Sequence, residues 1–117
     1  MAITEPFELD GVTIGATEWS VSTNSAGPDL NTTAGVYQLW VDCVGVLAKG
    51  DEFAIRGYEK VEATGGSQRL FMKAILSDVQ SEVFVTPTFI LMNGWDFTLQ
   101  KVAGTDRAFD AVIRKVA

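Results

Sequence analysis

The stretch that decides the fold class runs from residue 88 to residue 99 and reads Thr88-Phe-Ile-Leu-Met92, Asn93-Gly94, Trp95-Asp-Phe-Thr-Leu99. Asn-Gly favours a type I′ hairpin turn, because both residues tolerate a positive φ. A two-residue loop predicts three cross-strand pairs: Met92 with Trp95, Ile90 with Phe97, and Thr88 with Leu99. Five of these six side chains are apolar, so the pattern predicts two antiparallel strands with one face in a core.

The pattern continues toward the C-terminus. The loop at residues 103–107 predicts a further strand to Val116, with Phe97 opposite Ile113 and Asp96 opposite Arg114. Such a three-strand meander would bury its apolar face and expose the charged pair.

A second hairpin is predicted at Gly65-Gly66, and it pairs Ile55 with Leu76 and Gly57 with Ala74. Its other face would hold four of the nine basic residues together with two aromatic rings. A solvated outer face is one interpretation. The other is a subunit-contact surface, because basic and aromatic residues make good anchors. The residues of this predicted contact face are Arg56, Tyr58, Lys60, Arg69, Phe71 and Lys73.

The remaining segments complete an all-β chain. Tyr37, Leu39, Val41 and Cys43 alternate with more polar residues and are expected to face the core, while Thr23–Ala34 is expected to be a loop. We count about seven or eight strands and no helix longer than a turn. The predicted fold is an antiparallel β-sandwich (jelly-roll-like) or a small barrel. We expect one domain over residues 10–117, preceded by an acidic arm over residues 1–9.

The charge distribution is uneven along the 117 residues. The net charge is −6, yet the first 48 residues contain six acids and no Lys or Arg. This excess predicts neither nucleic acid nor a membrane as a partner. It serves solubility, or it marks an arm that binds a basic surface through Glu5, Glu8 and Asp10. The N-terminus has no signal-peptide pattern and no apolar run is long enough to cross a bilayer.

Catalytic patterns are missing from the sequence. It has no histidine and a single cysteine, which excludes Ser-His and Cys-His pairs and histidine metal sites. We therefore expect no enzyme activity, no cofactor and no metal. Carboxylates near turns (Asp51, Glu52, Asp106 and Asp110) are usual turn formers. The three tryptophans, Trp19, Trp40 and Trp95, leave open a carbohydrate-binding module, although the predicted pairing places Trp95 in the core.

Several segments together resemble small acidic proteins encoded among the virion-structural genes of tailed bacteriophages. They are Val36–Asp42, Gly50–Lys60, Gly94–Leu99, Ala103–Arg107 and Ile113–Lys115. A small β-sandwich in that group is most like a capsid decoration (cement) protein, and a neck or tail component is the alternative. The resemblance implies binding to the major capsid protein and to itself as a homo-oligomer, with a trimer favoured. It also implies a place in the virion after assembly in the host cytoplasm.

Overall fold

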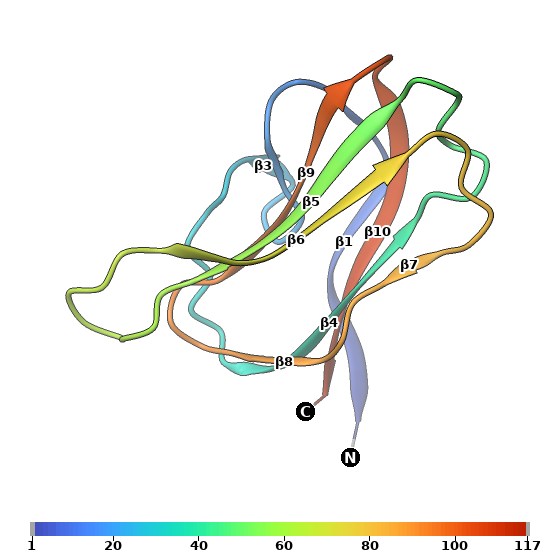
Figure 1. The fold of residues 1–117 in the computed structure, drawn as a ribbon. Coiled ribbons are helices and arrows are strands. Elements are labelled where there is room, and N and C mark those ends of the chain that lie inside the picture. The colour runs from blue at the N-terminus through green and yellow to red at the C-terminus, as the bar shows by residue number, and fades with distance from the viewer. Residues whose placement is uncertain (1, 117) are drawn as a thin grey trace.

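The computed structural model describes residues 2–116, and it confirms the predicted antiparallel β-sandwich (Figure 1). These residues form ten strands, some of only two residues, and no helix. The count exceeds the seven or eight expected because short pairings join the loops to the sheets. The strands are β1 (Ile3–Ile14), β2 (Trp19–Ser20), β3 (Ser25–Ala26), β4 (Gly35–Asp42), β5 (Glu52–Glu59), β6 (Arg69–Ser77), β7 (Phe84–Val85), β8 (Phe89–Leu91), β9 (Asp96–Ala103) and β10 (Arg107–Val116).

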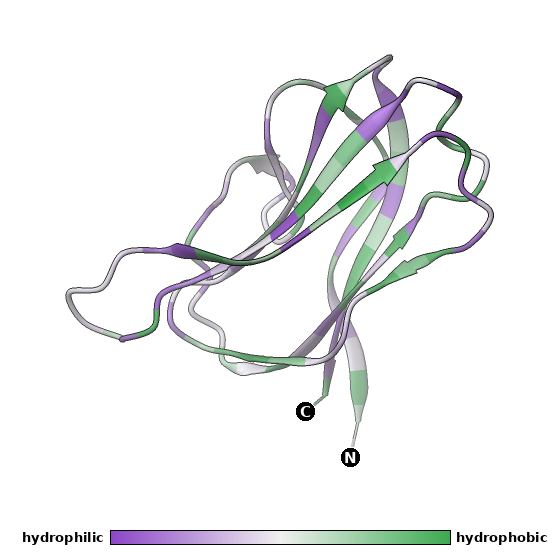
Figure 2. Ribbon diagram, viewed as in Figure 1, coloured by the Kyte–Doolittle hydropathy of each residue, from purple (hydrophilic) through white to green (hydrophobic). Residues whose placement is uncertain are grey.

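Two five-stranded sheets make the two layers. The first has the order β1-β10-β4-β7, and β8 pairs with β4. The second has the order β3-β2-β9-β5-β6. Both sheets contribute buried apolar side chains to one core, and Figure 2 shows hydropathy alternating along the long strands. Within residues 2–116 no helix is long and apolar enough to span a membrane.

The core fills the space between the two sheets. The alternation predicted for β4 is confirmed, because Tyr37, Leu39, Val41 and Cys43 are all buried. Trp95 is also completely buried, as predicted, and its indole Nε1 donates a hydrogen bond to the Thr33 carbonyl at 3.0 Å. Aromatic rings pack at this end of the core, where the Tyr37 and Trp95 centroids lie 4.3 Å apart.

The predicted hairpin at Asn93-Gly94 is wrong, although the turn exists and Gly94 has a φ of +87°. β8 pairs with β4 and β9 pairs with β5, so the turn carries the chain from one sheet to the other. The backbone of Asn31 pairs with that of Trp95. The Asn31 N–H donates to the Trp95 carbonyl at 3.0 Å, and the Asn31 carbonyl accepts the Trp95 N–H at 2.8 Å. A local turn signal fixes a reversal of the chain, but distant segments decide which strand is the partner.

The predicted pairing of β9 with β10 is wrong for the same reason, since these strands belong to different sheets. Asp96 does not meet Arg114. It is completely buried and accepts hydrogen bonds from the backbone N–H groups of Asp29 and Phe97, each at 2.8 Å. Arg114 instead pairs with Glu5 at 3.1 Å. Burial raises the pKa of Asp96, and these donors lower it in part.

β5 and β6 do pair, but the register predicted from Gly65-Gly66 is wrong. Ile55 lies opposite Ala74 and Gly57 opposite Met72, and a bulge follows Gly57. The connection spans residues 60–68 and extends away from the sandwich (Figure 1). Its base is tied to the 92–94 turn, because the Glu59 carboxylate accepts the Asn93 N–H at 3.0 Å.

The acidic arm predicted for residues 1–9 has no counterpart among the residues described. From Ile3 onward the segment is the first part of β1, and it pairs with β10. Leu9 is buried and Phe7 packs against the core. The predicted boundary between residues 9 and 10 falls inside β1, where apolar residues that alternate with the acids contact the sandwich. Met1 and Ala117, at the ends of the two predicted ranges, lie outside the described residues.

Candidate interaction surfaces

An apolar groove lies between the β5–β6 hairpin and β8. It has a volume of about 280 Å³ and is lined by Val61, Leu70, Phe71, Phe89, Ile90 and Leu91, with Glu59, Lys60 and Arg69. Val61 is 87% exposed and Ile90 77% exposed, and Figure 2 shows hydrophobic colouring along the β8 segment. A group of exposed apolar side chains of this kind is typical of an interaction surface.

The structure divides the six residues of the predicted contact face between two sides of the second sheet. Arg56 and Tyr58 turn to the outer side, where both meet Glu18. The Tyr58 hydroxyl donates to Glu18 Oε2 at 2.6 Å, and Arg56 lies 3.7 Å from the same oxygen. Burial, and then the hydrogen bond to Glu18, raise the pKa of Tyr58 to about 12. Lys73, opposite Arg56, is exposed.

Phe71 and Arg69 lie by the apolar groove instead. Phe71 is the residue without a β5 partner at the bulge after Gly57, and its partly exposed ring lies with its centroid 4.9 Å from that of Phe89. Lys60 lines the groove as well, so the six residues form two small surfaces and not one continuous face. Sequence reasoning missed Val61 and Ile90, because the predicted registers gave both of them to core-facing positions.

A second groove, the acidic groove, lies on the outer face of the first sheet and has a volume of about 330 Å³. Its lining includes the three predicted arm residues, Glu5, Glu8 and Asp10. It also includes Asp42, which the sequence did not single out, and Asp110, which the sequence indicated only as a carboxylate near a turn. The register explains the clustering, because Glu8, Val112 and Trp40 lie side by side across β1, β10 and β4, and Asp110 lies opposite Asp42. No sequence signal joins residues so far apart in the chain.

Trp40 and Arg114 form the other part of the acidic groove. The Arg114 guanidinium lies 4.0 Å from the centroid of the Trp40 ring, which is a cation–π contact. The Trp40 indole Nε1 donates to Gln38 Oε1 at 2.9 Å. Trp40 and Trp19 are both half-buried, but Trp19 lies in β2 of the other sheet, where it hydrogen bonds to Asn24 at 2.9 Å. The three tryptophans therefore do not gather in one site.

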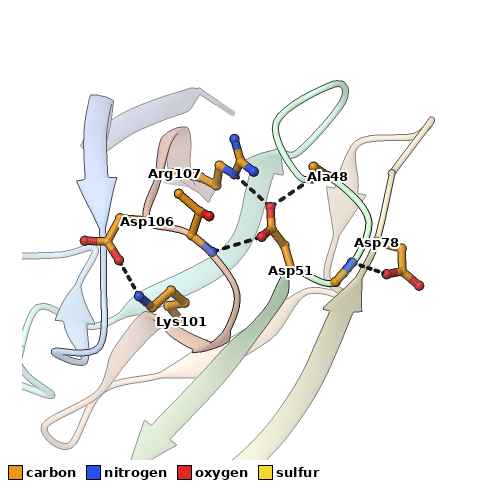
Figure 3. Close-up of polar contacts among 8 residues, drawn as sticks. Ala48, Asp51, Asp78, Lys101, Asp106 and Arg107 are labelled. Atoms are coloured by element: carbon orange, nitrogen blue, oxygen red, sulfur yellow. Dashed lines mark hydrogen bonds and ion pairs between the residues drawn. The ribbon is translucent and has the colours of Figure 1, made fainter.

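The carboxylates noted near turns hold loops together (Figure 3). Asp51 accepts the Ala48 N–H at 2.8 Å, the Thr105 N–H at 3.0 Å and Arg107 Nε at 2.7 Å. These two backbone hydrogen bonds, and then Arg107, lower the pKa of Asp51 to about 2. Asp106 pairs with Lys101, as Figure 3 also shows. These contacts account for Asp51 and Asp106 as loop-forming residues.

Asp110 and Cys43, the other candidate groups, have contacts that are explained by the fold. Asp110 accepts the Gly11 N–H at 2.6 Å and so fixes the second irregularity of β1. Cys43 is buried, and burial raises the pKa of its thiol, as for a small core side chain. Among residues 2–116 no group of three or more His, Cys, Asp or Glu side chains is arranged to hold a metal ion.

No protein-family profile matches the chain, and no curated protein matches it. A solved structure from Clostridium thermocellum, the N-terminal endo-1,4-β-D-xylanase 10B with its CBM22-1 and GH10 modules in complex with xylohexaose, is similar at a TM-score of 0.42 and 11% identity. The similarity covers 99% of this chain and 28% of the xylanase chain. A similarity at this level carries no argument about function.

Proposed function

We propose that this chain is a structural protein of a phage virion that works by surface contact, and specifically that it is a capsid decoration protein. The observation that supports the proposal is the apolar groove beside β8, where strongly exposed apolar side chains stand next to Lys60 and Arg69. Keeping such a surface in water is unfavourable, so a partner that covers it gains binding free energy. The resemblance to virion-structural proteins names the partners, which are the major capsid protein and further copies of the chain.

The test is cryo-electron microscopy of the virion that contains this chain. A decoration protein should be found in a number of copies close to that of the major capsid protein, in a closed oligomer such as a trimer on local symmetry axes. A few copies at the neck or tail would instead identify the alternative virion component. Absence from the purified particle would contradict both assignments.

The apolar groove can be tested separately. Replacing Ile90 with Asp places a charge in the groove at a side chain that is already largely exposed, so the fold should remain stable while binding to capsids is lost. Val79 is a matched control, because it is 68% exposed and does not line the groove. If Ile90→Asp binds capsids as well as Val79→Asp does, the groove is not the contact.

Carbohydrate binding is the second candidate function, and one observation favours it. The half-buried ring of Trp40 lines the acidic groove beside carboxylates that can accept hydrogen bonds from sugar hydroxyl groups. A glycan array tests this candidate. Binding that is lost in Trp40→Ala and kept in Trp19→Ala would support it, and no binding across a broad array would contradict it.

A further inference from the structure

The two long edge strands of the sandwich lie on opposite flanks. β1 is at one edge of the first sheet and pairs only with β10, while β6 is at one edge of the second sheet and pairs only with β5. β6 contacts β8 through Phe71 and Phe89, and β10 and β4 separate β8 from β1. Each flank therefore presents the open backbone edge of a strand, which is a place where another chain can add.

The two flanks carry opposite charges. β1 contains three acids, Glu5, Glu8 and Asp10, and no Lys or Arg, whereas β6 contains Arg69 and Lys73 and no Asp or Glu. Glu5 pairs with Arg114. Within residues 2–116 the other four charges have no ion-pair partner within 4.0 Å. The unpaired charges on one flank thus match those on the other in number and are opposite in sign.

The β6 flank also has apolar side chains that residues 2–116 leave about half exposed. Leu70 is 50% exposed and Ile75 is 43% exposed, and both belong to this edge strand. Lysine and a bulge, which usually protect an edge strand from association, are present at Lys73 and after Gly57. The basic residues of β6 disfavour contact between two β6 strands, because two basic edges would repel each other. An acidic partner is therefore the favourable one.

We propose that a second copy of this chain covers the β6 flank with its β1 flank, so that Glu8 and Asp10 of one copy approach Lys73 on the outer side of β6 and Arg69 beside the apolar groove of the next. Pro6 and the two irregularities of β1 divide the strand into short regular runs at residues 3–4, 7–9 and 12–14. Side chains therefore carry most of the contact. Because the two surfaces differ, the contact joins copies head to tail, and repetition closes into a ring or continues as a filament.

This inference rests on the proposed function only in that both work by surface contact. It names a second copy as the partner of the β6 flank, and it can be tested with the purified chain in the absence of any capsid. Failure of self-association would leave capsid binding open, and failure of capsid binding would leave self-association open.

The experiment uses two charge-reversed variants. The first is Arg69→Glu/Lys73→Glu, and the second is Glu8→Lys/Asp10→Lys. Sedimentation velocity measures self-association of each variant and of an equimolar mixture, at low salt and at about 0.5 M salt, where exposed charges are screened. Lys49→Glu is the control, because it changes an exposed lysine in the loop before β5. Circular dichroism confirms that each variant is folded.

The parent chain should self-associate at low salt and less so at high salt. Each double variant alone should associate at least about tenfold more weakly, because both cross-flank pairs become repulsive. The mixture should recover association, since the reversed β6 flank of one variant then matches the reversed β1 flank of the other. A parent chain that stays monomeric, variants that associate like Lys49→Glu, or a mixture that does not recover would each overturn the proposal.

Discussion

Replacing Leu9 with Ala tests whether the acidic N-terminal segment is part of the sandwich. Leu9 is 2% exposed and belongs to the core, although it lies only a few residues from the start of the chain. Burial of its side chain and the cavity left by truncation together predict a loss of about 3 kcal/mol in the free energy of unfolding. For a domain of this size such a loss lowers the melting temperature by roughly 12 °C.

Urea denaturation followed by tryptophan fluorescence measures the free energy, and calorimetry measures the melting temperature. Ile3→Ala is the matched control, because Ile3 is in the same strand and 69% exposed. Its effect should stay within about 0.5 kcal/mol, as for most surface substitutions. A loss below about 1 kcal/mol for Leu9→Ala would refute the reasoning, because it would mean that residues 3–9 behave as a free arm in solution.

Three further predictions concern Asp51, the pair of Glu18 with Tyr58, and the glycine beside Asp51. Folding lowers the pKa of Asp51 from its ordinary value of 3.8 to about 2. The contribution of Asp51 to stability is therefore complete above pH 3.8 and is lost as the pH falls toward 2. Urea unfolding at a series of acid pH values should show that the stability of the parent chain falls more steeply across this range than that of Asp51→Asn. Glu18→Gln should lower the pKa of Tyr58 from about 12, because the carboxylate no longer disfavours the tyrosinate, and an ultraviolet titration that shows no change would contradict the role of Glu18. Gly104→Ala should destabilise the fold by more than Gly65→Ala. Both glycines have a positive φ (+91° and +73°), but only at Gly104 would a new Cβ clash with Asp51. Equal decreases in melting temperature for the two variants would show that the clash is relieved.

The class of fold could be predicted from local patterns. Alternation along β4 places Tyr37 and Leu39 inward because successive side chains of a strand point to opposite faces. The pattern also identifies Trp95 as a core residue. The β5–β6 pair was predictable too, because consecutive strands usually lie side by side.

Strand partners were less predictable. The turn at Asn93-Gly94 has the local chemistry of a hairpin, but Asn31 takes the backbone groups of Trp95 and β8 joins β4. These competing contacts come from segments more than fifty residues away, and nothing in the turn itself encodes them. The wrong partner of β8 also placed Ile90 in the core. The pair of Asp96 with Arg114 came from a second wrong pairing, that of β9 with β10 across the loop at residues 103–107.

The candidate surfaces were also predictable only in part from the sequence. The acids Glu5, Glu8 and Asp10 were identifiable as a charged group because they are close in the chain. That they share a groove with Asp42 and Asp110 follows only from the register of β10 between β1 and β4. The predicted basic face was divided because a single bulge in the β5–β6 pair rotates the residues beyond it to the other side.

The sequence by itself therefore determined an all-β chain, the residues that alternate into its core and the concentration of acid near its N-terminus. These properties depend on side-chain period and composition, which are local. Only the tertiary structure decided which strands are neighbours, that the acidic segment is an edge strand, and that the acidic and basic edges lie on opposite flanks. Those properties depend on competition among distant backbone groups for the same hydrogen-bond partners, and on one-residue irregularities that reverse the direction of a side chain.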